Sequence, residues 1–178
     1  MSVTPHSDIK LHIGGTERRE GWAILNIVPG PHVDYIGHCK DLSFLANESC
    51  AEVYASHVLE HLGYNGEIQL ALKEACRVLK PGGRIRVSVP DLEILCRLFI
   101  HPKGTFKDRY RIMRMMFGGR GDAYDVHQSG LTFELLHYFL EEAGFTRISR
   151  VENFGEFNDT SQQKYGAQPI SLNMEAYK

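Results

Sequence analysis

The chain has 178 residues, of which 43% are hydrophobic and 24% are charged, with a formal net charge of −2. This length predicts one domain, residues 1–178, with a single core. The near-neutral charge gives no strong signal for nucleic acid as a partner. The segment MSVTPHSDIK lacks an apolar signal core, and no run reaches about 18 apolar residues, so we expect no membrane span and a cytoplasmic location.

The first strand is predicted over residues 8–13, where apolar residues alternate from Ile9 to Ile13. Gly14 and Gly15 follow at once. Glycines at this position let the backbone approach a ligand closely, although two glycines also make an ordinary turn.

Two further short strands are predicted, over residues 21–27 and 33–37. Residues 16–20 are too few for a helix between the first two strands, because a crossover between parallel strands normally takes a dozen residues or more. We therefore expect a charged loop in place of the first crossover helix.

The stretch from residue 51 to residue 93 predicts a strand, a helix and a second strand. The apolar face of the helix is formed by Ile68, Ala71, Leu72, Ala75, Cys76 and Leu79. Asn65 is the expected N-cap, and residues 81–83 (Pro-Gly-Gly) predict a tight exit from the helix. The next run, residues 85–89, has strand periodicity, so the two strands are predicted to be parallel.

A group of polar side chains lies just past the carboxyl end of the first of these strands: Ser56, His57, Glu60 and His61. Ligands of open parallel sheets bind at this edge. Two imidazoles and a carboxylate within six residues could bind a ligand or act as acid and base near neutral pH. The alternative is structural, with His61 capping a short helix and His57 facing solvent.

The second half predicts three helices, over residues 91–100, 106–117 and 132–143, and strands over 146–151 and 170–177. The segment 154–167 reads as a long polar loop.

Two side chains of this region stand out. His127 lies in a loop with Tyr124 and Asp125, which is a second concentration of acid and base groups. Arg86, in the middle of a predicted buried strand, suggests that one sheet face is less covered than usual.

The four cysteines, Cys39, Cys50, Cys76 and Cys96, show no zinc-site spacing, and no metal site is predicted.

Two segments carry a family resemblance. VYASHVLEHL (residues 53–62) and RVLKPGGRIRVSVPDLE (residues 77–93) resemble the fourth-strand and fifth-strand motifs of class I S-adenosylmethionine-dependent methyltransferases, in the branch of small predicted bacterial enzymes. The resemblance covers roughly residues 9–150. It implies an α/β, Rossmann-like, mostly parallel seven-stranded sheet with flanking helices and an antiparallel last strand, here with the first crossover helix shortened or absent.

The resemblance also implies S-adenosylmethionine as cofactor. Its contacts would come from His12, Gly14, Gly15, Asn26, His38, Cys39 and Ser56. These positions depart from the family pattern in three ways. Gly14 and Gly15 replace a richer glycine motif. Asn26 replaces an acidic residue that accepts from the ribose hydroxyls, which should weaken binding by about 1 kcal/mol. His38 replaces an aspartate that accepts from the adenine amino group, and the histidine would accept through one ring nitrogen.

The leading functional expectation is methyl transfer to an undetermined acceptor. His57, His61 and His127 are candidates for orienting the acceptor or removing its proton, and no metal is required. No helix is predicted before the first strand. The site should therefore be open to a sugar, a lipid-linked intermediate or a protein, or be closed by another chain, for which a homodimer is one option.

Two other functions compete with this one. A non-catalytic subunit that senses the cofactor or binds a partner would explain the departures at the cofactor positions. A nicotinamide-dependent oxidoreductase is less favoured, because the full dinucleotide glycine pattern and its distal acid are absent.

Overall fold

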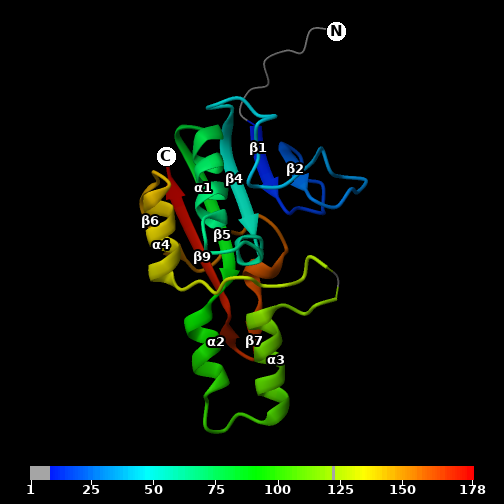
Figure 1. Ribbon diagram of the computed structural model, residues 1–178, viewed down its shortest axis with the longest axis vertical. Coiled ribbons are helices and arrows are strands. Elements are labelled where there is room, and N and C mark those ends of the chain that lie inside the picture. The colour runs from blue at the N-terminus through cyan, green and yellow to red at the C-terminus, as the bar shows by residue number, and fades with distance from the viewer. Residues whose placement is uncertain (1–8, 122) are drawn as a thin grey trace.

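The computed structural model describes residues 9–121 and 123–178 (Figure 1). Predictions made for residues 1–8 lie outside this part. The described strands form a seven-stranded sheet in the order β3-β2-β1-β4-β5-β9-β6. These strands are β1 (Ile9–Ile13), β2 (Trp22–Asn26), β3 (Tyr35–Ile36), β4 (Cys50–Ser56), β5 (Leu79–Pro90), β6 (Thr146–Val151) and β9 (Ser171–Tyr177). A small hairpin, β7 (Lys164–Tyr165) and β8 (Gln168–Pro169), lies apart from the sheet.

The directions of the strands confirm the predicted Rossmann-like sheet. Strands β1 to β5 pair parallel, and β9 pairs antiparallel with both β5 and β6. The last strand therefore lies inside the sheet and runs against its neighbours, as the resemblance implied.

The connections of the first three strands contain no helix. Residues 14–21 join β1 to β2, which confirms the absent first crossover helix. Residues 27–34 and 37–49 make the next two connections. The described helices follow β4: η1 (Leu59–His61), α1 (Glu67–Val78), α2 (Leu92–Phe99), α3 (Phe106–Phe117), α4 (Phe133–Glu142) and η2 (Thr160–Gln162). None of them is long and apolar enough to cross a membrane.

One face of the sheet carries the main hydrophobic core. Helices α1 and α4 pack on this face, and their apolar stripes meet the inward residues of the strands. Typical members are Leu11, Val53 and Ile85 from the sheet and Leu72 and Leu140 from the helices, all buried. The alternation of apolar residues along each strand puts the remaining side chains on the opposite face.

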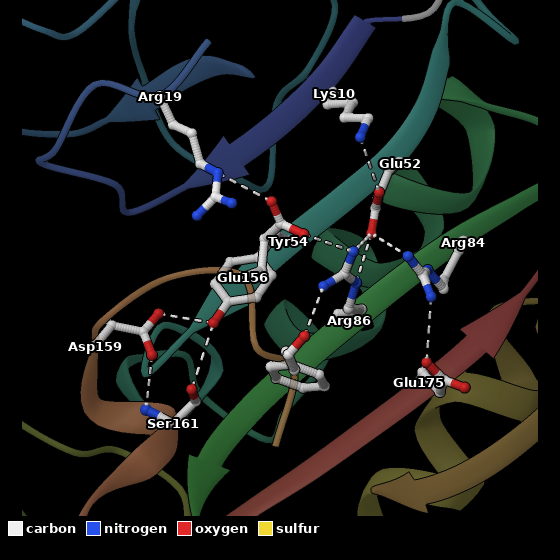
Figure 2. Close-up of polar contacts among 11 residues, drawn as sticks. Lys10, Arg19, Glu52, Tyr54, Arg84, Arg86, Glu156, Asp159, Ser161 and Glu175 are labelled. Atoms are coloured by element: carbon white, nitrogen blue, oxygen red, sulfur yellow. Dashed lines mark hydrogen bonds and ion pairs between the residues drawn. The ribbon is translucent and has the colours of Figure 1, made fainter. Parts of the chain in front are cut away.

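That opposite face is polar and is covered by the segment 152–163, which we call the covering segment. Phe154 and Phe157 of this segment pack with Tyr54 and Trp22 in a second, aromatic cluster. Figure 2 shows the charged groups beside it, including Arg86, which is only 5% exposed. This face was predicted to be less covered than usual; a loop takes the place of helices on it, and Arg86 is nevertheless buried.

The α1 region differs from the prediction at both ends. The N-cap position is held by Gly66, with no side-chain cap, so Asn65 is not the cap. At the other end β5 begins at Leu79 directly after the helix. Pro81 and the two glycines lie within the strand, but residues 80–83 bulge from its pairing with β4, and Gly82 has the positive φ (+75°) predicted for the exit.

Helices α2 and α3 form a pair beyond the carboxyl end of β5 (Figure 1). Asp91 caps α2 by accepting from the Ile94 N–H at 3.2 Å. Thr105 and Asp108 form a capping box at the start of α3. A third apolar cluster, built on Leu95, Ile112 and Ile170, ties the pair to the end of the sheet.

Candidate functional site

A cavity of about 380 Å³ lies at the carboxyl ends of the parallel strands. Its lining comes from the ends of β1 and β2 and from the segments after β3 and β4. The lining residues include Ile13, Gly14, Leu25, Asn26, Ile27, Val28, His38, Cys39, His57, Val58, His61, Leu62, Tyr124 and Gln128. We call it the first cavity. Its size and its apolar walls with few polar groups are typical of small-molecule sites.

Gly14 is required where β1 enters this cavity. Its φ of +78° is a left-handed conformation, and a Cβ there would lie 2.7 Å from Cγ2 of Val58. The Gly14 N–H donates to the Leu25 carbonyl at 2.8 Å, which holds the turn against β2. Any larger residue would push Val58 or the turn into the cavity.

Asn26 lines the cavity, but its side chain is already engaged. Nδ2 donates to the Gly15 carbonyl at 3.0 Å, and Oδ1 accepts from the Val28 N–H at 3.0 Å. The amide therefore joins the two loops that follow β1 and β2. One lone pair of Oδ1 remains for a hydroxyl donor.

His38 presents a donor to the first cavity. Its Nδ1 accepts from the Lys40 N–H at 3.2 Å, so the neutral ring carries its proton on Nε2. Burial, with a smaller contribution from Lys40, lowers the pKa of His38, which keeps the ring neutral at pH 7. The expected acceptance from an adenine amino group is therefore wrong for this tautomer.

Cys39 is buried beside His38. Burial raises the pKa of its thiol to about 11, so the side chain stays protonated and is no nucleophile at neutral pH. Only its place in the wall of the cavity, and its backbone, are available for a ligand.

The other three residues predicted for the cofactor do not line this cavity. His12 points to the opposite sheet face, where its ring lies among Trp22, Tyr54 and Phe157. A Cβ on Gly15 would lie 2.7 Å from Nδ1 of His12, and the Gly15 carbonyl accepts from Asn26. The Ser56 hydroxyl lies 3.5 Å from that of Thr160. The sequence placed these residues near the right strand ends but could not show which face they occupy.

A second cavity, of about 310 Å³, lies on the far side of His57. It is lined by His57, Pro90, Arg111, Arg114, Met115, Gly119, Asp125, His127, Gln163 and Ile170. Helix α3 and the loop after it form one wall, and the end of the covering segment forms another. His57 lines both cavities.

The His57 side chain is held at this junction from two sides. Its φ of +54° is unusual for a residue with a side chain, and its N–H donates to the Ser88 carbonyl at 2.8 Å. The Ser171 hydroxyl donates to the Thr160 carbonyl at 2.7 Å, so its oxygen accepts from Nε2 of His57 at 3.1 Å. Nδ1 lies 3.2 Å from Glu60 Oε1.

His61 and His127 come together although 66 positions separate them. Their ring centroids lie 5.0 Å apart, almost perpendicular at 79°. His61 Nδ1 donates to the Val126 carbonyl at 3.1 Å, and the Gln128 side chain donates to the His61 carbonyl at 2.8 Å. Burial lowers the pKa of His127. The three histidines predicted as catalytic candidates thus surround Glu60.

Sequence reasoning missed several residues of the site. Ser171, which holds His57, follows it by 114 positions, and no local signal links the two. Val58 reads as an ordinary apolar residue of the loop after β4. Gln128 could have been noticed as a polar neighbour of His127.

An open parallel sheet with a ligand-sized cavity at its carboxyl edge is the architecture of nucleotide-cofactor-binding α/β proteins. Residues 25–87 match the family model described as "Methyltransferase domain". With the strand order and the antiparallel last strand, this match confirms the resemblance to class I S-adenosylmethionine-dependent methyltransferases. No curated protein sequence matches the chain.

Solved structures of methyltransferases share the fold at low identity. An S-adenosylmethionine-dependent methyltransferase from Archaeoglobus fulgidus matches with a TM-score of 0.62 and 16% identity, over 96% of this chain and 86% of that chain. A possible histamine N-methyltransferase from Thermotoga maritima matches with a TM-score of 0.54 and 18% identity, over 97% and 83%. Human N-acetylserotonin methyltransferase in complex with S-adenosylmethionine matches with a TM-score of 0.55 and 16% identity, over 96% of this chain and 47% of that chain. These matches establish the fold.

Proposed function

We propose that the chain transfers the methyl group of S-adenosylmethionine to a nucleophilic atom of an acceptor bound in the second cavity. The observation that carries this proposal is the position of His57, which lines both cavities and marks the point where their contents would meet. A group-transfer site needs two ligands in contact, and the reaction depends chiefly on their relative position.

The residues of the first cavity fit the cofactor. Gly14 leaves space at the cavity wall that a Cβ would fill. The Nε2–H of His38 suits a ring nitrogen of adenine. The free lone pair of Asn26 Oδ1 suits a ribose hydroxyl. When bound, S-adenosylmethionine supplies an electrophilic methyl group on its sulfonium.

The protein would contribute positioning and the exclusion of water. Ser171 holds the His57 ring at the junction, so this ring would orient the acceptor atom. His61 and His127 are further candidates for orienting the acceptor. A base is needed only when the acceptor must lose a proton.

Arg111 and Arg114 make the second cavity suited to an acceptor that carries negative charge. Guanidinium groups bind phosphate and carboxylate through paired donors. Among the acceptor classes considered from the sequence, a sugar phosphate or a phosphate-bearing lipid-linked intermediate therefore fits better than a neutral small metabolite.

Calorimetric titration with S-adenosylmethionine and S-adenosylhomocysteine tests the first step. We expect both to bind, and no heat of binding at millimolar cofactor would contradict the proposal. Release of S-adenosylhomocysteine is then measured with sugar phosphates, lipid-linked substrates and proteins as acceptors. His57→Ala should abolish release by any accepted substrate while the cofactor still binds.

A non-catalytic, cofactor-sensing subunit is the second candidate function. The engaged, uncharged amide of Asn26 favours it, because this side chain offers less to the ribose than a carboxylate would. Cofactor binding without turnover on any acceptor would support this function.

A further inference from the structure

Glu60 is a deeply buried carboxylate of the site region, and it lacks hydrogen-bond partners among the described residues. The residue is 1% exposed, and neither carboxylate oxygen has a hydrogen-bond partner among the described residues. Nδ1 of His57 lies 3.2 Å from Oε1, but without the alignment of a hydrogen bond. Burying an ionised carboxylate costs several kcal/mol unless a positive charge or a metal compensates it.

Two imidazoles face this carboxylate and are held as metal ligands usually are. His61 donates from Nδ1 to the Val126 carbonyl, which leaves the lone pair of Nε2 free. The ring of His127 lies beside the backbone of Met116, and one of its nitrogens lies within 4.8 Å of the ligand atoms of Glu60 and His61. A backbone carbonyl that accepts from the second ring nitrogen fixes the tautomer and direction of a ligating histidine.

A small cavity adjoins two of these three groups. A cavity of about 10 Å³ lies beside Glu60 and His127, and about this volume holds one water molecule or ion. Ser129 also lines it, and its buried hydroxyl has no partner among the described residues. One ligand atom each from Glu60, His61 and His127 lies within 4.8 Å of the others.

We propose that Glu60, His61 and His127 bind a first-row divalent transition-metal ion of the zinc type. Two histidines and one carboxylate are a known ligand set for zinc and for non-haem iron. Ligands at 2.0–2.1 Å from a tetrahedral ion lie about 3.3 Å apart. The site must therefore contract by roughly 1.5 Å at most, which rotation of the two imidazoles can supply.

Such an ion would keep an open position. Three protein ligands leave at least one site of a tetrahedral ion for water or substrate. His127 also lines the second cavity, and His61 lines the first, so the ion would sit beside the junction at His57. A role of the ion in methyl transfer rests on the proposed function, whereas its binding does not.

Cobalt(II) titration tests the site directly. The tag-free protein, treated with chelator and carrying Cys96→Ser to remove its exposed thiol, is titrated with Co²⁺. We expect one ion per chain and visible absorption bands of nitrogen and oxygen coordination. Zn²⁺ should displace the Co²⁺ and raise the melting temperature.

Matched variants locate the ion. Glu60→Gln, His61→Gln and His127→Gln should each weaken Co²⁺ binding by about a hundredfold or more. His101→Gln, at an exposed histidine between α2 and α3, should bind as the parent does. His61 and His127 are only half-buried, so their variants remain informative if Glu60→Gln fails to fold, and circular dichroism confirms each fold.

Two results would overturn the proposal: no Co²⁺ binding by the parent protein, or binding unchanged in both histidine variants. Cofactor titration of the same proteins is read separately. A protein that binds Co²⁺ but no S-adenosylmethionine would contradict the proposed function and leave the metal site standing.

Discussion

Gly14 illustrates how one residue decides whether a ligand fits. Its left-handed backbone and its approach to Val58 both exclude a side chain. We predict that Gly14→Ala weakens binding of S-adenosylmethionine at least tenfold, which is about 1.4 kcal/mol. Gly82→Ala is the control, because Gly82 has a φ of +75° but open space where the Cβ would lie. Equal cofactor affinities of the two variants in calorimetry would show that the Val58 contact is irrelevant to the site.

His12 makes the stability of the fold depend on pH. Burial lowers its pKa from 6.5 to about 4, against an opposing effect of Asp159. Between these values the unfolded chain binds a proton that the folded chain does not, so acid favours unfolding. Through His12 alone, the free energy of unfolding falls by about 2 kcal/mol between pH 7 and pH 5.

The substitution His12→Phe should remove this contribution, because phenylalanine suits the aromatic neighbours and does not titrate. Urea unfolding of the parent and the variant at pH 7 and pH 5 measures the pH-dependent loss of stability in each protein. We expect the variant to lose less stability than the parent on acidification. The same loss in both proteins would mean that His12 is not the group responsible.

At the scale of the structural elements, the stability of the polar sheet face depends on its ion pairs. Glu52 accepts from Arg84 at 3.0 Å and from the buried Arg86 (Figure 2). Glu52→Gln would leave Arg86 with less charge compensation, and we predict a loss of about 3 kcal/mol in the free energy of unfolding. Glu93→Gln, which breaks the exposed pair with Arg97, should cost less than about 1 kcal/mol. Comparable losses in denaturant titrations would contradict the view that burial makes the difference.

Helix α3 depends on its capping box. Thr105→Ala removes the side-chain acceptor for the Asp108 N–H and should cost about 1 kcal/mol. Hydrogen exchange should then quicken in α3. The control Thr132→Ala removes the cap of α4 and should affect that helix instead. If α3 supplies the acceptor wall as proposed, Thr105→Ala also raises the KM for acceptor and leaves cofactor affinity unchanged.

The sequence was informative where structure is local. The β4-α1-β5 unit, the helices of the second half and the absence of a first crossover helix follow from periodicity and spacing over a few residues. The group of His57, Glu60 and His61 could be placed at a ligand edge for the same reason.

The remaining features depend on contacts between distant residues. Nothing near His12 indicates that Phe157 will enclose it, and nothing near His57 shows that Ser171 will hold its ring. A long polar loop was predicted after residue 154, but its role as the cover of a sheet face required the folded chain.

Across the whole molecule, the covering segment joins stability to the site. Phe157 packs on the sheet, while Thr160 accepts from the Ser171 hydroxyl that holds His57. We predict that Phe157→Ala lowers the free energy of unfolding by about 3 kcal/mol and also impairs turnover on any accepted substrate. Asn153→Ala, at an exposed position of the same segment, should change neither. Normal turnover by folded Phe157→Ala would show that the covering segment stabilises the fold without supporting the site.

This double role limits how the protein can diversify. Loops beside an active site commonly vary freely, and new specificities arise through such variation. Here the covering segment ends at Gln163 in the wall of the second cavity. The same segment also covers one face of the sheet. Laboratory evolution toward new acceptors should therefore recover changes in α3 and the loop after it far more often than in residues 154–161.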